Sequence, residues 1–383
     1  MATTDWQRWR AEFPSTADQV HMNHAGLAPL PLRAAAAIRA FADQALRVNG
    51  SIYRGWEERA ETVRASAARL IGAAPGEIAF VKNTAEGLSL IAAGLTWRAG
   101  DNVVAIADEY PSNVYPWLGL GRLGVETRLA ARSGVCFGVE EVAAHVDSRT
   151  RVVAVSAVDW LSGFRADLSA VGAFCRDRDI LFVVDGIQAV GGMCVDVDRA
   201  GIDCMAVGGH KWLLAPEGCG FLFVSARVLD RLHPVLLGWK SVIDADAYLP
   251  YHLTLRDDAA RFEPGTQMHL GIAALGASID LLLEVGPHAV EARILSHTDA
   301  LAADLRALGA TILSPRGAAE RSGILTFALG DTDALYASLL RHGVNVRRRL
   351  GGIRLSPHFY TDESDIARVL DAVRAARARP SLS

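Results

Sequence analysis

Two stretches of the chain decide the fold, Ile180-Leu181-Phe182-Val183-Val184-Asp185-Gly186-Ile187-Gln188 and Cys204-Met205-Ala206-Val207-Gly208-Gly209-His210-Lys211-Trp212. In each, a short apolar run leads into glycine and polar residues. Apolar runs of this length predict strands that are buried on both faces of a parallel sheet. Asp185 and Lys211 are therefore predicted at the carboxyl edge of that sheet, which is where ligands bind in open α/β folds.

Similar apolar runs alternate with helical patterns from residue 78 to residue 224. This alternation is typical of a mostly parallel sheet with helices on both faces. The other predicted strands are Ile78–Val81, Val103–Ala107, Val152–Val155 and Phe221–Val224, and the predicted helices are Ala85–Leu95, Val139–His145 and Leu168–Arg178.

The pattern changes after Gly286-Pro287, where a long apolar helix over Leu270–Val285 ends. A chain of 383 residues is also long for one core. We expect a large domain over residues 25–285 and a smaller α+β domain over 286–383, with the segment 1–24 packed on the smaller one. The elements expected there are the helices Ala289–Leu308, Asp333–Arg341 and Glu363–Ala376 and the strands Ile324–Ala328 and Gly352–Leu355.

Bulk composition excludes several classes of partner. The formal net charge is -4 and the pI is about 6.3, which favours neither nucleic acid nor an anionic membrane as partner. No apolar run reaches about 18 residues, and the N-terminus lacks the apolar core of a signal peptide. The five cysteines are scattered, with no CxxC pair and no zinc-like cluster with histidines. We therefore expect a cytoplasmic protein with reduced thiols and no metal site.

Lysine is scarce, since it occurs only at Lys82, Lys211 and Lys240. Lys211 and Asp185 follow successive predicted strands, so an amine and a carboxylate are expected side by side. Pyridoxal 5'-phosphate (PLP) requires an amine to bind its aldehyde and an acid opposite its ring nitrogen. A buried Asp beside that nitrogen stays ionised because opposite charge favours the charged form. The pair therefore predicts a PLP site with Lys211 and Asp185 as catalytic residues.

A phosphate site is predicted at Lys82-Asn83-Thr84-Ala85-Glu86-Gly87, which lies between a predicted strand and a predicted helix. Backbone N–H groups at the start of a helix bind phosphate directly, and Thr84 adds a hydroxyl. By contrast, no G-x-G-x-x-G sequence opens a helix after the first strand, which disfavours a nicotinamide cofactor.

Taken together, these motifs resemble those of fold-type I PLP enzymes of the class V aminotransferase family. That family includes cysteine desulfurases, selenocysteine lyases, kynureninases and isopenicillin N epimerase-like enzymes. The resemblance extends from Asn23 to Tyr360. It implies PLP as cofactor, an α-amino acid substrate and the α/β fold of PLP-dependent transferases, which has a mainly parallel seven-stranded sheet in the large domain and a smaller α+β C-terminal domain.

The resemblance assigns cofactor contacts position by position. Glu109-Tyr110-Pro111-Ser112-Asn113 matches a motif whose second residue stacks on the cofactor ring, so Tyr110 is expected to do so, in place of the histidine that is usual in desulfurases. A tyrosine offers the flat face but no histidine proton shuttle. Gly208 departs from relatives that have Ser or Thr there. The resemblance thus implies that PLP contacts Thr84, Ala85, Glu86, Tyr110, Asp185, Gln188 (at the phenolic oxygen), His210 (at the phosphate) and Lys211.

Two further assignments concern the substrate and a second subunit. Arg354 resembles the arginine that binds the substrate α-carboxylate, a task suited to the guanidinium fork. Asn23, His24 and Ala25 resemble the stretch that passes near the substrate. Thr266 resembles the threonine that reaches the phosphate of the partner subunit, which implies a homodimer with shared active sites.

The reaction is less constrained than the cofactor. Desulfurases that form a persulfide carry a cysteine before the carboxylate-binding arginine, whereas Val346–Ile353 contains none. Val158–Arg165 resembles the segment of epimerase-like and C–S lyase-like members. We therefore expect C–S (β-) lyase chemistry without a persulfide cysteine. Aminotransferase and epimerase activities remain alternatives, and an inactive partner protein with this fold is an alternative of a different class. We expect side-chain selectivity in loops such as Arg47–Trp56 and His233–Tyr251.

Overall fold

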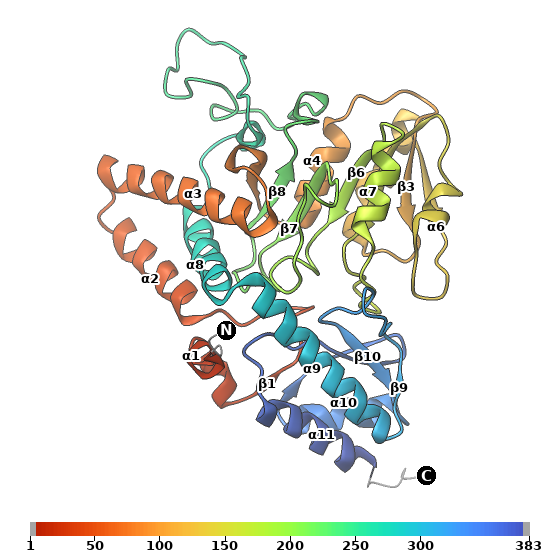
Figure 1. Ribbon diagram of the computed structural model, residues 1–383. Helices are drawn as coiled ribbons and strands as arrows, with labels where there is room; N and C mark the ends of the chain where they lie inside the picture. The colour runs from red at the N-terminus through yellow and green to blue at the C-terminus, as the bar shows by residue number, and fades with distance from the viewer. Residues whose placement is uncertain (1–4, 378–383) are drawn as a thin grey trace.

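A computed structural model describes residues 5–377 and contains a central seven-stranded sheet (Figure 1). Six strands run parallel, and β8 alone runs antiparallel, between β2 and β7. The predicted fold class is therefore confirmed. In spatial order the strands are β2 (Ile78–Val81), β8 (Gly220–Val224), β7 (Cys204–Gly208), β6 (Leu181–Asp185), β5 (Thr150–Ser156), β3 (Asn102–Ile106) and β4 (Glu126–Ala130).

Helices bury both faces of this sheet, because successive strand residues point to opposite sides. In β3, Val103 and Ala105 belong to one apolar cluster with residues of α4, whereas Val104 and Ile106 belong to another with residues of α3, α7 and α8. The helices of this part of the chain are α2 (Leu32–Ala45), α3 (Gly50–Ile71), α4 (Thr84–Gly94), α5 (Tyr115–Leu118), α6 (Val139–Ala143), α7 (Leu168–Arg176) and α8 (His269–Val285).

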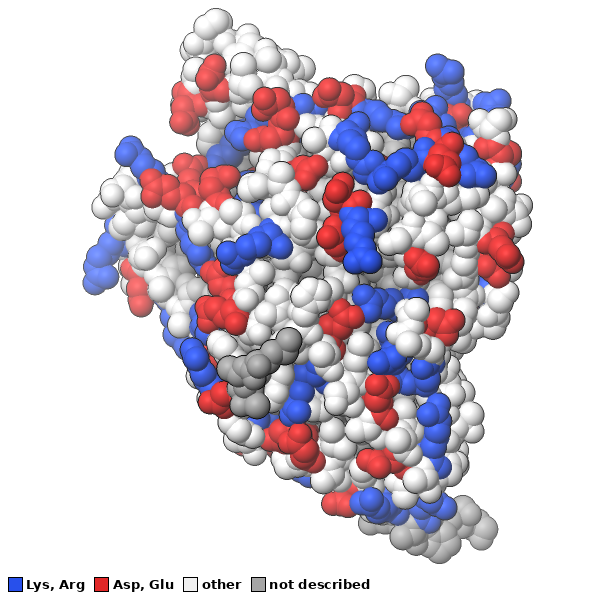
Figure 2. All heavy atoms as spheres, in the orientation of Figure 1, with Lys and Arg blue, Asp and Glu red and all other residues white. Residues whose placement is uncertain are grey.

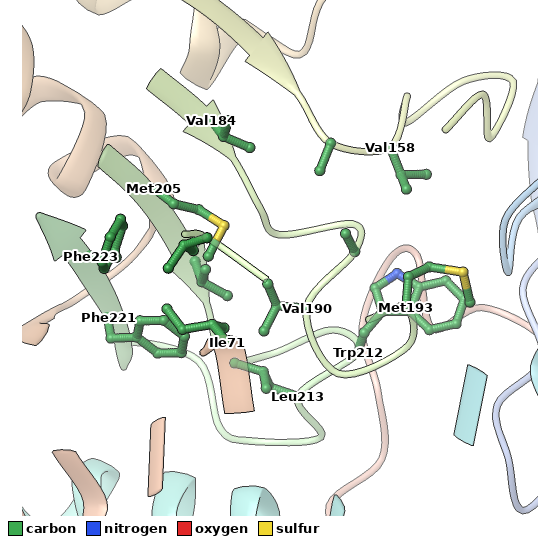
Figure 3. Close-up of a cluster of buried hydrophobic side chains, with 14 of the residues drawn as sticks. Ile71, Val158, Val184, Val190, Met193, Met205, Trp212, Leu213, Phe221 and Phe223 are labelled. Carbon is green, nitrogen blue, oxygen red and sulfur yellow. The ribbon is translucent and has the colours of Figure 1, made fainter. Parts of the chain in front are cut away.

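Buried side chains fix the turn that follows β7. Figure 3 shows Met205 of β7 and Phe221 of β8 packed with Ile71, the last residue of α3. Trp212, directly after Lys211, is also buried in this cluster. A β-carbon at Gly192 would lie 2.5 Å from the Trp212 ring, so glycine is needed for the indole to fit. Trp212 therefore anchors the lysine turn in the core.

A second sheet of four strands, in the order β12-β13-β10-β9, packs with the C-terminal helices, shown in blue in Figure 1. Its apolar cluster is separate from the two that cover the large sheet. The elements are α9 (Pro287–Ala307), β9 (Thr311–Ile312), β10 (Leu325–Ala328), α10 (Thr332–Arg341), β11 (Val344–Asn345), β12 (Arg347–Arg349), β13 (Gly352–Leu355) and α11 (Glu363–Arg377).

The N-terminal segment contacts this second unit. After α1 (Trp6–Arg10), β1 (Val20–His21) pairs parallel with β11. The Phe13 ring stacks on Tyr360 with a centroid distance of 3.7 Å, and the Arg10 guanidinium pairs with Asp365 at 2.6 Å. These contacts support the division that we propose, 25–285 and 286–383 with 1–24 on the latter. Residues 1–4 and 378–383 of those ranges lie outside the described part.

Some elements were not expected from sequence. The edge strand β4 buries only one of its five residues, so it lacks the apolar run that marks the other strands. Helices α2 and α3 were also missed. Residues 50–56, which we expected to lie in a loop, form the start of α3, whose Asn49 side chain accepts hydrogen bonds from the Ser51 and Ile52 N–H groups.

Basic and acidic side chains are interspersed on the face of the molecule shown in Figure 2. Within residues 5–377, no single helix is long and apolar enough to cross a membrane. Helices α8 and α9 meet that length and composition only as a pair, and an 81° bend separates them.

Candidate active site

Lys211 lies in the turn after β7, at the carboxyl edge of the sheet. Its side chain is buried, with 8% of the residue exposed. Burial lowers the pKa of the amine to about 8; Asp185 opposes this effect, and Arg354 and Arg349 add to it. About one Lys211 amine in ten is therefore neutral at pH 7, and the neutral amine is the form that reacts with an aldehyde.

Asp185 is the last residue of β6, the strand adjacent to β7. Its Oδ1 accepts a hydrogen bond from the Ile187 N–H at 3.0 Å. Burial raises the pKa of this carboxyl to about 6, while the Ile187 N–H and the Lys211 charge act against the rise. A cationic ring nitrogen facing the carboxylate would further favour its ionised form. The predicted acid and amine thus lie at the same edge of the sheet and affect each other's titration.

Tyr110 follows β3 and faces the lysine. The Lys211 Nζ lies 5.4 Å from the centroid of the Tyr110 ring. The Trp160 ring meets the Tyr110 ring edge to face, with centroids 5.4 Å apart. Tyr110 is 43% exposed, so one side of its ring is free to stack on a planar ligand. This placement supports the predicted stacking role.

The start of α4 carries unused donors. Thr84 is buried, and its Oγ1 has no hydrogen-bond partner within the described chain. A β-carbon at Gly208 would lie 3.2 Å from that oxygen and 3.5 Å from His210 Cε1, so all three residues border one small space. An orphaned hydroxyl, a histidine and helix-terminal N–H groups fit a phosphate. The site thus accommodates the cofactor that the sequence predicts.

Glu86 was expected to contact the phosphate, but its polar groups are occupied by neighbouring residues. Its N–H donates to Asn83 Oδ1 at 2.9 Å, and its carboxylate accepts from the Lys82 N–H at 2.6 Å. Because Asn83 caps the helix and occupies this N–H, the donors left for phosphate at the first turn are those of Thr84 and Ala85.

Gln188 joins the lysine turn to the N-terminal segment. Its Nε2 donates to the Ala25 carbonyl at 3.0 Å, and its Oε1 accepts from the Trp212 indole N–H at 3.0 Å. The amide has a second N–H hydrogen, which remains for the predicted contact to the cofactor's phenolic oxygen.

The residues expected near the substrate divide into two groups. Asn23 Oδ1 is buried and has no partner in the described residues. His24 is buried, and its Nδ1 and Nε2 lie 2.8 Å from the Ser356 carbonyl and 2.7 Å from the Tyr360 hydroxyl. Both ring nitrogens of His24 are thus occupied inside the protein, which differs from the expected substrate contact. Ala25 lies beside them, and its N–H donates to Ser356 Oγ.

Arg354 lies on β13 and is 2% exposed. Its Nη1 donates to the Trp160 carbonyl at 2.7 Å, and its Nε is buried without a partner in the described chain. Burial, together with the charges of Arg349 and Arg347, lowers the pKa of the guanidinium to about 10. A buried guanidinium with a free donor and cationic neighbours favours an anion, as expected for a substrate carboxylate.

Thr266 is exposed, at the end of a loop that is anchored in the core. The anchor is Glu263, whose carboxylate accepts from Arg64 Nη1 at 2.6 Å and from the Phe80 N–H at 2.7 Å. This ion pair is buried on both sides. Thr266 therefore lies at a defined place on the surface, as a residue directed to a partner subunit would.

Glu109 is a site residue whose role the sequence did not reveal. It is buried beside Tyr110, and its carboxylate accepts from the Ser156 N–H at 2.8 Å and from the Ser156 hydroxyl at 2.5 Å. Burial raises the pKa of this carboxyl to about 7; the Ser156 hydrogen bonds lower it and the nearby Asp185 raises it. Its position between a strand end and the stacking tyrosine is the pattern that could have identified it.

The hairpin that carries Arg354 has no cysteine. Strands β12 and β13 are joined by Leu350 and Gly351, both with positive φ, which makes a tight two-residue turn. The five cysteines, Cys136, Cys175, Cys194, Cys204 and Cys219, are elsewhere in the chain, and all are free thiols.

Comparison with known proteins agrees with this geometry. A family model described as aminotransferase class-V matches residues 23–369. A probable cysteine desulfurase of Methanothermobacter thermautotrophicus is 33% identical over 78% of this chain and 75% of its own. Isopenicillin N epimerase of Streptomyces clavuligerus is 30% identical over 98% of this chain and 99% of its own.

Solved structures extend the comparison to the fold. An apo cysteine desulfurase of Thermococcus onnurineus superposes with a TM-score of 0.87 at 23% identity, covering 97% of this chain and 98% of that one. A cystine C–S lyase in complex with cysteine persulfide gives 0.87 at 24% identity, covering 96% and 100%. With PLP as its cofactor and amino acids as its substrates, the chain belongs to the class V aminotransferase family of enzymes.

Proposed function

We propose that this enzyme cleaves the C–S bond of a cysteine-type amino acid by β-elimination and does not form a persulfide on its own chain. The observation that carries the proposal is the β12–β13 hairpin. A persulfide-forming enzyme needs a thiolate beside the carboxylate-binding arginine, and here a two-residue turn flanked by arginines occupies that place. A sulfur group that is stable as an anion could leave this site without transfer to a protein thiol.

We propose the following roles for the chain's own residues. Arg354 binds the substrate α-carboxylate and so fixes the Cα–H bond toward Lys211. The neutral amine of Lys211, favoured by its pKa of about 8, takes the Cα proton. PLP, when bound, would supply the electron sink for this proton abstraction, and Asp185 would be the acid that pairs with its ring nitrogen. Tyr110 offers its ring face to the cofactor, and the Trp160 ring packs edge to face against it.

The absence of a histidine at position 110 bears on the leaving group. Tyr110 cannot shuttle protons as an imidazole does near neutral pH. The reaction breaks the Cα–H and Cβ–S bonds, and the sulfur departs with the bonding electrons. A substrate whose sulfur is stable as an anion needs no donated proton, and we propose that this class is preferred. The likeness to a cystine C–S lyase in fold agrees with this choice.

Epimerisation is the second candidate, because isopenicillin N epimerase matches almost the whole chain. Transamination is a third outcome of the same proton abstraction. An inactive partner protein is disfavoured, since Lys211, Asp185, Gln188 and His210 are all present and Lys211 and Asp185 are coupled electrostatically.

We further propose a homodimer with shared sites, in which Thr266 reaches the phosphate of the second subunit. Large apolar side chains are exposed in one segment near that loop, which is typical of a protein interface. They are Val235, Leu236, Leu237, Trp239, Ile243, Tyr248, Leu249, Tyr251 and Leu253.

The deciding experiment incubates the PLP-loaded enzyme with a panel of L-amino acids, including cysteine, cystine, S-alkylcysteines and alanine. Pyruvate, sulfide, keto acid and D-isomer are scored in parallel. The lyase proposal predicts pyruvate with release of the sulfur group from at least one S-substituted cysteine. A keto acid that retains the side chain would instead identify the reaction as transamination. A D-isomer as the sole product would identify it as epimerisation.

A further inference from the structure

The β12–β13 hairpin presents three arginines on one face. In its antiparallel register Arg347 lies opposite Arg354, and Arg349 lies opposite Gly352. Since side chains alternate along a strand, Arg347, Arg349 and Arg354 share a face, and Arg348 points to the other. Arg349 and Arg354 are diagonal neighbours, about 7–8 Å apart in such a ladder. The two arginines are therefore neighbours on one face of the hairpin.

Arg349 and Arg354 converge on the same aromatic residue. The Arg349 Cζ lies 5.3 Å from the centroid of the Trp160 ring, and Arg354 Nη1 donates to the Trp160 carbonyl. Each has a buried Nε without a partner among residues 5–377. Both also lower the pKa of Lys211, so both lie close to the reacting amine. Arg349 therefore lies beside Trp160 and within electrostatic reach of Lys211.

The positive charge of this pocket exceeds what one carboxylate can neutralise. The acid whose charge acts on Arg354 is Asp159, which raises the pKa of that guanidinium. The Asp159 carboxylate is already bound by Arg132 at 3.1 Å and by the Ser162 N–H and hydroxyl, each at 2.6 Å. The substrate α-carboxylate would neutralise the charge of Arg354, and the charge of Arg349 would remain without a counterion.

The uncompensated positive charge is found on only one face of the β12–β13 hairpin. Arg348, on the opposite face, forms an ion pair with Asp333 of α10 and stacks over Tyr336. Its charge is thus compensated on the surface, whereas within the described chain Arg349 has no carboxylate partner. Its one side-chain hydrogen bond goes to the Arg348 carbonyl at 2.8 Å. Arg348 is therefore a matched control for Arg349.

We propose that Arg349 binds a second carboxylate, carried at the far end of the substrate's side chain. If the enzyme is the β-lyase proposed above, its substrates are S-substituted cysteines whose S-substituent ends in a carboxylate. Such a substrate is bound at both ends, with the scissile C–S bond between Arg354 and Arg349. A free cysteine would use only one of the two guanidinium groups.

The test compares an acid with its neutral isostere. The probes are S-(2-carboxyethylsulfanyl)-L-cysteine and S-(2-carbamoylethylsulfanyl)-L-cysteine, mixed disulfides that release a persulfide anion on β-elimination and differ only in charge at the far end. We expect kcat/KM for pyruvate release to favour the acid by about 10- to 100-fold, the range for a charge-assisted hydrogen bond. In Arg349→Gln this ratio falls toward 1, in Arg349→Lys it is partly retained, and in Arg348→Gln it stays at the wild-type value. Any change in the Lys211 pKa affects both probes alike and cancels in the ratio.

A binding measurement separates this inference from the proposed reaction. Calorimetry gives the dissociation constants of glutarate and of its monoamide for the same PLP-loaded variants. If the wild-type protein binds glutarate more tightly than the monoamide and Arg349→Gln loses this difference, the subsite is supported. If in addition no probe yields pyruvate, only the lyase proposal is removed. The subsite would be overturned if the wild-type protein bound and cleaved the acid and the amide equally well. It would also be overturned if Arg348→Gln lost the preference for the acid as much as Arg349→Gln does. Neither result would bear on the lyase proposal.

Discussion

Lys211 of the apoenzyme should titrate with a pKa of about 8, against 10.5 for an ordinary lysine. The difference corresponds to about 3 kcal/mol between the charged and neutral forms. At pH 7 about one amine in ten is then neutral, compared with roughly one in 3,000 for an ordinary lysine, a gain of about 300-fold in the reactive form. The main cause is burial, because a charged amine loses its hydration in the interior.

Competitive labelling of the apoenzyme with acetic anhydride between pH 6 and pH 11, read by mass spectrometry, measures this titration. The chain has only three lysines, so each peptide is easily assigned. The midpoint of the labelling curve, and not its height, is the observable, because a buried amine reacts more slowly at every pH. The exposed Lys82 serves as the reference within the same sample.

Two variants should move the midpoint in opposite directions. Arg354→Met removes a nearby positive charge and should raise the pKa of Lys211, whereas Asp185→Asn removes a negative charge and should lower it further. A wild-type midpoint near 10.5, or shifts in the same direction for both variants, would refute this account of the site's electrostatics.

Four further outcomes follow from the same geometry. Lys211→Ala loaded with PLP should lack the absorbance band of the lysine imine and give no borohydride-fixed label, and label found instead on Lys82 would overturn the assignment. Asp185→Ala should lose about 1,000-fold or more in kcat, equivalent to about 4 kcal/mol, and a loss within threefold would exclude its role opposite the ring nitrogen. Arg354→Ala should raise KM for amino acids by about 10- to 100-fold, measured by steady-state kinetics; an unchanged KM would place the carboxylate elsewhere. Thr84→Ala should weaken PLP binding about fivefold in equilibrium titration, for the loss of one hydroxyl hydrogen bond, and an unchanged constant would exclude that contact.

Local sequence determined the central sheet and its chemical edge. The runs that end at Asp185 and precede Lys211 are apolar enough to favour burial on both faces, which is typical of the strands of a parallel sheet covered by helices. The cofactor could be predicted because PLP needs an amine for its aldehyde and an acid for its ring nitrogen. The sequence places one of each at the ends of adjacent strands. Strand β4 escaped prediction because an edge strand exposes most of its residues and leaves no apolar run.

Contacts between distant segments decided the rest. Nothing in the sequence around His24 indicates that Ser356 and Tyr360 occupy both of its ring nitrogens, because those partners lie more than 330 residues away. Likewise, the sequence shows three successive arginines at 347–349, but only pairing with β13 separates Arg349, which lies over Trp160, from Arg348, which pairs with Asp333. Propensity and hydrophobic pattern act over a few residues, whereas desolvation and charge pairing depend on which segments meet, and these set the pKa of Lys211 and the surplus charge beside it.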